Sequence, residues 1–140
     1  MPMLSSISGR WRERVASKRI LVIDDASLVR LYYRDALERA GFAVEEALNG
    51  LEALEKLLVV PADLLIVDIN MPKMDGLTFL RTLRRQDRTI SATPALVTST
   101  ETGPQDVEAS RAAGANFYLA KPVAQDVLVA YAAMLCGAPA

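Results

Sequence analysis

The sequence predicts an α/β fold in which five parallel strands alternate with five helices, a doubly wound (βα)5 arrangement. From Arg19 onward, short apolar runs alternate with longer segments of helical periodicity, and each run ends near a turn-forming residue. Such alternation is typical of a parallel sheet covered by helices on both faces. The 140 residues, 51% of them apolar, suffice for one domain with a hydrophobic core.

Each element is expected from its own local pattern. RILVI at 19–23 is continuous and β-branched, as expected for a strand buried on both faces. The segment 27–41 has apolar residues at helical spacing and ends at Gly41, while Pro104 and Gly114 suit the first turn and the end of a later helix. The remaining strands are expected at 42–47, 63–67, 94–98 and 116–120, and the remaining helices at 49–58, 76–85, 104–114 and 124–135.

The predicted domain occupies residues 18–136, with an extension at 1–17 and a short tail at 137–140. In the extension, Leu4, Ile7, Trp11 and Val15 fall at spacings of three, four and four. This pattern is compatible with an amphipathic helix that docks on the domain, on a second copy or on a partner, but also with a disordered tail.

Composition excludes several classes of function. Cys136 is the only cysteine and histidine is absent, so an internal disulfide, a His-ligated metal and a Ser/His or Cys/His nucleophile are excluded. The formal charge of −1 argues against nucleic acid as a partner. The sequence contains no run of eighteen apolar residues, so no membrane span is predicted. We therefore expect a cytoplasmic protein that binds hard metal ions through oxygen, if it binds any.

Charged and hydroxyl side chains follow four of the predicted strands. Because the carboxyl ends of parallel strands meet at one edge of a sheet, these side chains should lie together. Three crowded carboxylates raise one another's pKa unless a cation compensates them, and Mg²⁺ prefers such oxygen ligands. An aspartate beside that ion can attack phosphorus, with an ammonium and a hydroxyl stabilising the phosphoryl oxygens. The residues concerned are Asp24, Asp25, Asp68, Thr98 and Lys121.

Four motifs in order, ILVIDD, VDINMPKMDG, ALVTS and YLAKP, carry a resemblance to a known family. The chain resembles the CheY-like receiver domain of response regulators in two-component signalling over roughly residues 18–134. This resemblance implies a flavodoxin-like sheet with strand order 2-1-3-4-5. It also implies that Asp68 accepts a phosphoryl group from a histidine kinase or a histidine phosphotransfer protein, and that the domain later removes the group itself with bound water.

The resemblance further implies individual roles. Asp25 would bind the metal ion directly, and Asp24 would bind it mainly through water. Asp68 and the backbone carbonyl of Asn70 would be further ligands. The ion would be Mg²⁺, or Mn²⁺ in its place. Thr98 and Tyr118 would be switch residues. Lys121 would pair with Asp68 or with its phosphate. The Lys121-Pro122 peptide bond resembles one that is commonly cis in these domains. All of these residues lie within the four motifs quoted above.

We expect a stand-alone regulator, because only four residues follow Cys136. Its phosphorylated state would be read by another protein at the fourth helix, fifth strand and fifth helix, through a shift in conformational population. Two alternatives stay open. One is a haloacid-dehalogenase-like phosphatase, whose acidic pair is spaced by one residue, whereas Asp24 and Asp25 are adjacent. The other is an interaction domain that no longer needs phosphate. Asp75, before Gly76, is expected to cap a helix.

Overall fold

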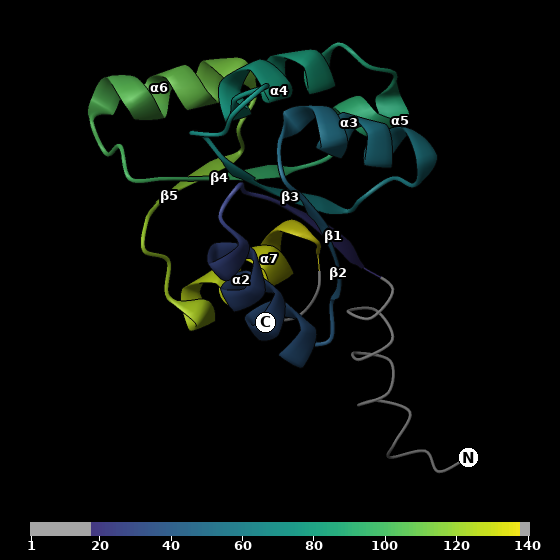
Figure 1. Cartoon of the computed structure of the whole chain (residues 1–140), viewed down its shortest axis with the longest axis vertical. Coiled ribbons are helices and arrows are strands. Elements are labelled where there is room, and N and C mark those ends of the chain that lie inside the picture. Colours follow the sequence, from purple (N-terminus) through teal and green to yellow (C-terminus); the bar gives the residue numbers. More distant parts are fainter. Residues whose placement is uncertain (1–17, 138–140) are drawn as a thin grey trace.

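The computed structural model describes residues 18–137, and a five-stranded parallel sheet forms its centre (Figure 1). The strand order β2-β1-β3-β4-β5 confirms the order that the sequence implied. All five residues of β3 and of β4 are buried, which explains their unbroken apolar runs. The strands are β1 (Arg19–Ile23), β2 (Ala43–Ala47), β3 (Leu64–Asp68), β4 (Ala95–Ser99) and β5 (Phe117–Ala120).

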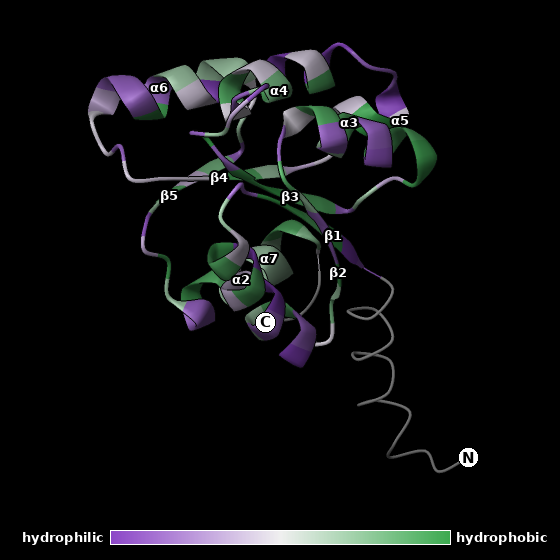
Figure 2. Ribbon diagram, in the orientation of Figure 1, coloured by the Kyte–Doolittle hydropathy of each residue, from purple (hydrophilic) through white to green (hydrophobic). Residues whose placement is uncertain are grey.

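Within residues 18–137, six helices cover the two faces of the sheet. In Figure 1, α2 and α7 lie on one face and the other four lie on the opposite face. Each face has its own cluster of buried side chains, and Figure 2 shows apolar residues concentrated in the strands between them. The helices are α2 (Ser27–Arg39), α3 (Gly50–Val59), α4 (Gly76–Arg84), α5 (Arg88–Ser91), α6 (Pro104–Ala113) and α7 (Gln125–Leu135).

The helix ends confirm the local interpretation. Gly41 and Gly114 follow α2 and α6 with φ of 100° and 116°, a conformation that glycine adopts without strain. Pro104 opens α6. The side chain of Asp75 accepts a hydrogen bond from Thr78 N at 2.9 Å, as expected for an N-cap, and Asn49 caps α3 in the same way.

The prediction of five helices was wrong by one, because the sequence interpretation left out α5. This helix has only four residues, too few for an apolar periodicity to be recognised. Its one local marker is Asp87, which accepts a hydrogen bond from Thr89 N at 3.1 Å. The proposed extension at 1–17 and most of the predicted tail lie outside the described residues. Within 18–137, every helix is too short or too polar to cross a lipid bilayer.

A half-buried arginine ties α4 to the elements around it. Arg84 Nε and Nη2 both donate to the carbonyl oxygen of Gly114, at 3.1 and 2.6 Å respectively. Its Nη1 donates to the carbonyl oxygen of Ser91 at 2.9 Å and to that of Thr93 at 2.6 Å. It also donates to Asn116 Oδ1 at 3.2 Å. Burial lowers its pKa, and the carbonyl dipoles take the place of an acidic partner. Arg84 therefore holds α4, α5 and the turn before β5 together.

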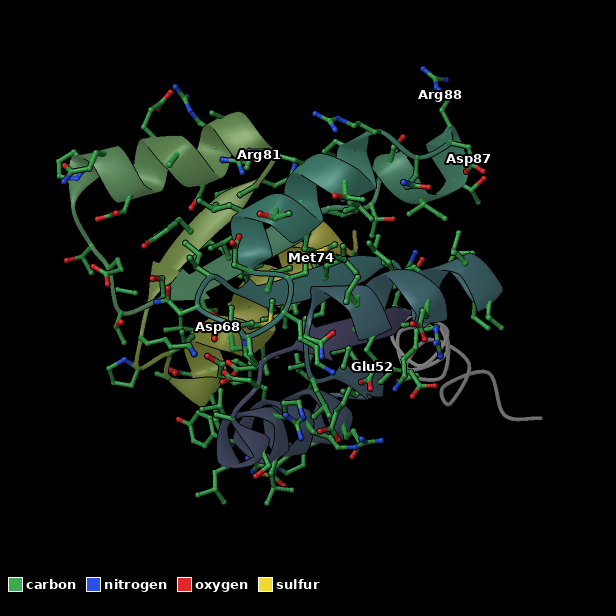
Figure 3. The ribbon with its side chains drawn as sticks, turned by 45° about the horizontal axis from the view of Figure 1, so that its top comes forward. Glu52, Asp68, Met74, Arg81, Asp87 and Arg88 are labelled. Carbon is green, nitrogen blue, oxygen red and sulfur yellow. The ribbon has the colours of Figure 1, made fainter. Side chains whose placement is uncertain are left out.

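We predict that Arg84→Met lowers the free energy of unfolding by about 2–4 kcal/mol, because it leaves several half-buried carbonyl groups without a donor. Arg84→Lys should recover little of this loss, since an ammonium cannot reproduce the planar fork of donors. Arg81→Met, an exposed position on the same helix (Figure 3), is the matched control and should change stability by less than about 0.5 kcal/mol. Equal losses for the two methionine variants, measured by urea denaturation, would contradict this role.

Candidate functional site

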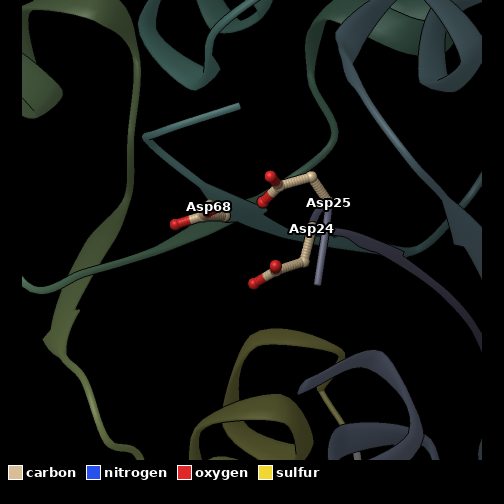
Figure 4. Close-up of side chains that lie close together, drawn as sticks. All are labelled: Asp24, Asp25 and Asp68. Atoms are coloured by element: carbon tan, nitrogen blue, oxygen red, sulfur yellow. The ribbon is translucent and has the colours of Figure 1, made fainter. Parts of the chain in front are cut away.

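Three carboxylates meet at the carboxyl edge of the sheet, as the sequence predicted (Figure 4). One oxygen from each of Asp24, Asp25 and Asp68 lies within 4.8 Å of the others. Asp24 is 1% exposed and Asp68 is 5% exposed, whereas Asp25 faces solvent. Two buried acidic groups at this separation need compensating charge.

Backbone hydrogen bonds fix the position of Asp24. Its N–H donates to the carbonyl of Ala47 at 3.1 Å, which continues the β1–β2 pairing by one residue. Its Oδ1 accepts from Ala26 N at 2.9 Å, just before α2 begins. Arg30 Nη1 donates to its carbonyl oxygen at 2.6 Å. The turn from β1 to α2 therefore directs this carboxylate into the site.

Gly76 allows α4 to begin against the end of β3. Its N–H donates to the carbonyl of Ile69 at 2.9 Å. A Cβ at this position would lie 2.5 Å from the carbonyl oxygen of Asp68 and 2.9 Å from the Cα of Ile69. Both contacts are with backbone, which cannot give way cheaply, so only glycine fits beside Asp68 without a shift of the strand or the helix.

Lys121 joins the two buried carboxylates. Its Nζ lies 2.9 Å from Asp24 Oδ2 and 3.1 Å from Asp68 Oδ1. The backbone places it there, since Lys121 N donates to the carbonyl of Ser99 at 2.8 Å directly after β5. The Lys121-Pro122 peptide bond is cis, as the family resemblance implied.

The charges in the site do not cancel. Burial raises the pKa of Asp68, and the Asp24 carboxylate raises it further, while Lys121 acts in the opposite direction. Burial alone would lower the pKa of Lys121, but its hydrogen bond to Asp24 and the charges of both buried carboxylates raise it overall. One ammonium thus faces three carboxylates. The site retains an excess of negative charge that a divalent cation would neutralise.

Thr98 lies directly beside Asp68. The two residues are paired in the β3–β4 register, so their side chains leave adjacent strands at the same level. Thr98 is fully buried, and its Oγ1 makes no hydrogen bond of ordinary geometry within the described part of the chain, although the Tyr33 side chain lies close to it. A buried hydroxyl without a partner is costly and rare in a folded protein. It is therefore available to a group bound at the site.

The other two predicted residues lie at the edge of the site. Tyr118, on β5, is half-buried, and its hydroxyl donates to the carbonyl of Glu101 in the loop after β4. Asn70 is exposed two residues beyond Asp68. The roles of Tyr118 as a switch residue and of the Asn70 carbonyl as a metal ligand stay predictions.

Sequence reasoning missed three residues that shape the site: Arg30, Tyr33 and Gly76. Tyr33 is almost fully buried under the site; burial raises its pKa, while Lys121 and the Thr98 side chain act against that rise. It also lines an apolar hollow of about 300 Å³ beside Lys121, between α2 and the segment after β5. In the sequence, Arg30 and Tyr33 fall within an ordinary amphipathic helix, and only the position of Gly76 at a helix start was visible.

The donor set suits Mg²⁺. Carboxylate oxygens are hard ligands, and Mg²⁺ is usually held by one or two of them together with water and phosphate oxygens. The three clustered carboxylates provide those ligands and the charge that a divalent ion would balance. Neither a histidine nor a clustered thiol, which would favour zinc, is present in the sequence.

The chain belongs to the response regulator receiver domain family, which matches residues 20–133. It is 38% identical over 116 residues to the transcriptional regulatory protein PrrA of Mycobacterium leprae, covering 83% of this chain and 48% of that protein. It is 40% identical over 116 residues to the sensory/regulatory protein RpfC of Xanthomonas campestris pv. campestris, covering 81% of this chain and 16% of that protein. The chain thus spans about half, or less, of these relatives.

Solved structures agree with this assignment. The chemotaxis protein CheY4 of Vibrio cholerae has a TM-score of 0.80 and 34% identity, with 84% of this chain and 98% of that chain covered. The receiver domain of the Francisella response regulator 1452 has a TM-score of 0.81 and 26% identity, with coverage of 86% and 98%. The protein is therefore a receiver domain of a response regulator, a class whose phosphodonor partners are in general histidine kinases.

We predict that Lys121→Met lowers the free energy of unfolding by about 3 kcal/mol at pH 7, because it leaves two buried carboxylates without their cation. The pKa of Asp68 is already raised in the wild type, and loss of the Lys121 charge would raise it further in the variant. At pH values above this raised pKa, Asp68 is ionised and destabilises the folded variant. Protonation removes this penalty, and the deficit should shrink toward pH 4, near the pKa of an unfolded aspartate at about 3.9.

The measurement is chemical denaturation at pH 7 and pH 4 without divalent ions. Lys73→Met, at an exposed position in the loop after β3, is the matched control and should show little loss at either pH. A deficit of Lys121→Met that is the same at both pH values would argue against charge compensation as its cause.

Proposed function

We propose that this receiver domain accepts a phosphoryl group on Asp68 from a phosphohistidine of a donor protein, in a Mg²⁺-dependent reaction. The single observation that carries this proposal is the convergence of Asp24, Asp25, Asp68 and Lys121 at one edge of the sheet, beside the unpartnered Thr98 hydroxyl. The phosphohistidine has to lie outside these 140 residues, because they contain no histidine. Membership of the receiver family supports the same conclusion.

In the proposed step, a carboxylate oxygen of Asp68 forms a bond to phosphorus while the phosphorus–nitrogen bond to the donor histidine breaks. The electron pair of that bond leaves with the histidine, and Asp68 becomes an aspartyl phosphate. Lys121, already 3.1 Å from Asp68, would pair with a phosphoryl oxygen, and Thr98 Oγ1 would donate to another. Attack of water on phosphorus would later release phosphate and restore the carboxylate.

Mg²⁺ would be held by the carboxylates of Asp24, Asp25 and Asp68 and by the backbone carbonyl of Asn70, with Mn²⁺ as a substitute. When bound, such an ion neutralises negative charge on the transferring phosphoryl group. The clustering of three oxygen donors around an excess of negative charge supports this assignment. Asp24 is also the residue that anchors Lys121, so it would orient the ammonium as well.

A donor protein would have to cover the mouth of the site, and the surface beside it is apolar. Leu28, Leu31 and Tyr32 are exposed on the first half of α2, and Tyr32 also lines the hollow of about 300 Å³ that Lys121 lines. Contiguous exposed apolar side chains indicate a surface that binds another protein. We assign this surface to the phosphohistidine donor because it adjoins Asp24 and Lys121.

The phosphorylated state would be read by a protein partner at the surface formed by α6, β5 and α7. This is the surface that the sequence interpretation assigned to the fourth helix, fifth strand and fifth helix. It carries a hollow of about 220 Å³ lined by side chains that include Val107, Arg111 and Tyr118. Movement of Thr98 toward a phosphoryl group would free space for the Tyr118 side chain, and so connect this surface to Asp68. We also propose that the domain acts as a stand-alone regulator.

We predict that incubation with Mg²⁺ and acetyl phosphate adds one phosphoryl group to the wild-type chain and none to Asp68→Asn, as measured by intact-protein mass spectrometry. Asp75→Asn is the matched control, since it makes the same chemical change in the same loop and asparagine also caps helices well. It should be phosphorylated normally. Wild-type chain that stays unmodified with acetyl phosphate and with phosphorylated histidine kinases would refute the proposal.

We predict that a beryllofluoride–Mg²⁺ titration followed by NMR moves the resonances of Thr98 and Tyr118 and of residues on α6, β5 and α7. The same titration of Asp68→Asn should leave them in place. Shifts confined to the residues around Asp68, with none at Tyr118, would contradict the switch role of Tyr118 while leaving the acceptor role intact.

The phosphatase alternative gives a different result in a simple assay. An enzyme acting on external substrates would turn over p-nitrophenyl phosphate many times, with loss of activity in Asp68→Asn. A receiver domain has no need of such turnover, and the family assignment favours the receiver. Sustained turnover would revive the phosphatase interpretation.

A further inference from the structure

A row of apolar side chains lies exposed to solvent along α3, from Leu51 near its start to Val59 and Val60 at its end. Leu58 is 68% exposed and Val59 is 81% exposed, and Leu51 and Val60 are also among the exposed apolar residues. Leu51 and Leu58 are two helical turns apart and so share one flank of α3, and Val59 and Val60 continue the group where the helix ends. We call these four residues the α3 ridge. Single exposed apolar residues are ordinary, but a contiguous group indicates a binding surface.

The chain enters the fold beside the α3 ridge. Arg19 N donates to Asp63 Oδ2 and Asp63 N donates to the carbonyl of Arg19, both at 2.7 Å. Asp63 follows Val60 by only three residues, a span of about 10 Å at most. The end of α3 and the beginning of β1 therefore share the amino-terminal edge of the sheet, opposite the edge that carries Asp68. Residues 1–17 precede this point in the sequence.

The sequence of residues 1–17 complements such a surface. Its apolar stripe of Leu4, Ile7, Trp11 and Val15 spans twelve residues, about 18 Å if helical, against about 15 Å for the ten residues of α3. A short amphipathic helix is marginal in water and forms when its apolar face is buried. We propose that residues 1–17 dock on the α3 ridge as an amphipathic helix and cover it.

Other occupants fit less well. Four partly exposed side chains offer far less than the roughly 800 Å² per partner of a stable protein–protein interface. A segment of the same chain needs less contact area, because its attachment gives it a high effective concentration. Among the described residues, a second exposed apolar group, Leu28, Leu31 and Tyr32, lies on the first half of α2, at the far edge of the sheet. A third, Phe117, Val127 and Met134, lies on β5 and α7, on the surface that the proposed function assigns to a protein partner. The docking does not depend on the proposed phosphoryl chemistry.

Trp11 is the only tryptophan, so its fluorescence in the full-length chain reports on the docking directly. We predict that Leu58→Gln and Val59→Gln each shift the Trp11 emission to longer wavelength and increase its quenching by acrylamide, because the indole loses its apolar contact. Leu28→Gln, at an equally exposed leucine of α2, is the matched control and should change neither quantity. Ile7→Gln should produce the same shift as Leu58→Gln, and combining the two should add little to either.

All substituted positions in the described part of the chain are exposed, so the fold should be retained, and far-UV circular dichroism would verify it. Trp11 emission and quenching that are the same in the wild type and in both ridge variants would overturn the proposal. A wild-type emission that depends on protein concentration, with the mass of a dimer in analytical ultracentrifugation, would also overturn it, since it would assign the α3 ridge to a second copy.

Discussion

The structure depends on the contact between the Lys121 ammonium and the two buried carboxylates of Asp24 and Asp68. Isolated buried charges are strongly unfavourable, so a fold that buries acidic groups at the ends of β1 and β3 has to place a cation between them. One lysine does not complete the compensation, because Asp25 adds a third carboxylate. In the proposed function, this remaining imbalance would make the edge of the sheet receptive to a divalent ion and, with it, to a phosphoryl group.

The sheet is more deeply buried at β3, which ends at the proposed acceptor Asp68, than at β5. Every residue of β3 is buried, α4 begins against the Asp68 backbone because Gly76 lacks a side chain, and Arg84 fixes the other end of α4. By contrast, no residue of the edge strand β5 is fully buried. Tyr118 therefore sits on the part of the sheet that can rearrange at the lowest cost. A phosphorylation signal would travel from the fixed centre to this adaptable edge through Thr98, which is paired with Asp68 on one side and with Leu119 on the other.

The two edges of the sheet have different tasks in this arrangement, and α3 connects them. At the carboxyl edge, Gly50 N donates to the carbonyl of Met74 at 3.3 Å, so the start of α3 contacts the loop that follows Asp68. Toward the amino edge, the same helix ends at Leu58, Val59 and Val60, three of the four residues of the α3 ridge. A segment bound to the α3 ridge would thus stabilise a helix that supports the acceptor loop, without covering the site itself. Covering the ridge would also remove exposed apolar area from the surface of the domain.

The sequence by itself determined the class of fold, the strand order through the family resemblance, and the positions of Asp24, Asp25, Asp68, Thr98 and Lys121 at the ends of strands. These follow from local pattern, because apolar runs, turn residues and the alternation of strand and helix are all encoded over short distances. Helix ends at Gly41 and Gly114 were visible for the same reason. The one-turn helix α5 was not, since four residues carry no periodicity.

Only the tertiary structure decided which groups touch. Lys121 bonds Asp24 across 97 positions of sequence, Arg84 reaches the turn before β5 across 30, and the Thr98 hydroxyl is left without a partner among the described residues. Gly76 is required because a backbone passes where its Cβ would be, and Tyr33 lies under the site although its helix pattern is ordinary. Such contacts result from the packing of distant segments, which no local pattern contains, and they set the electrostatic balance around Asp68.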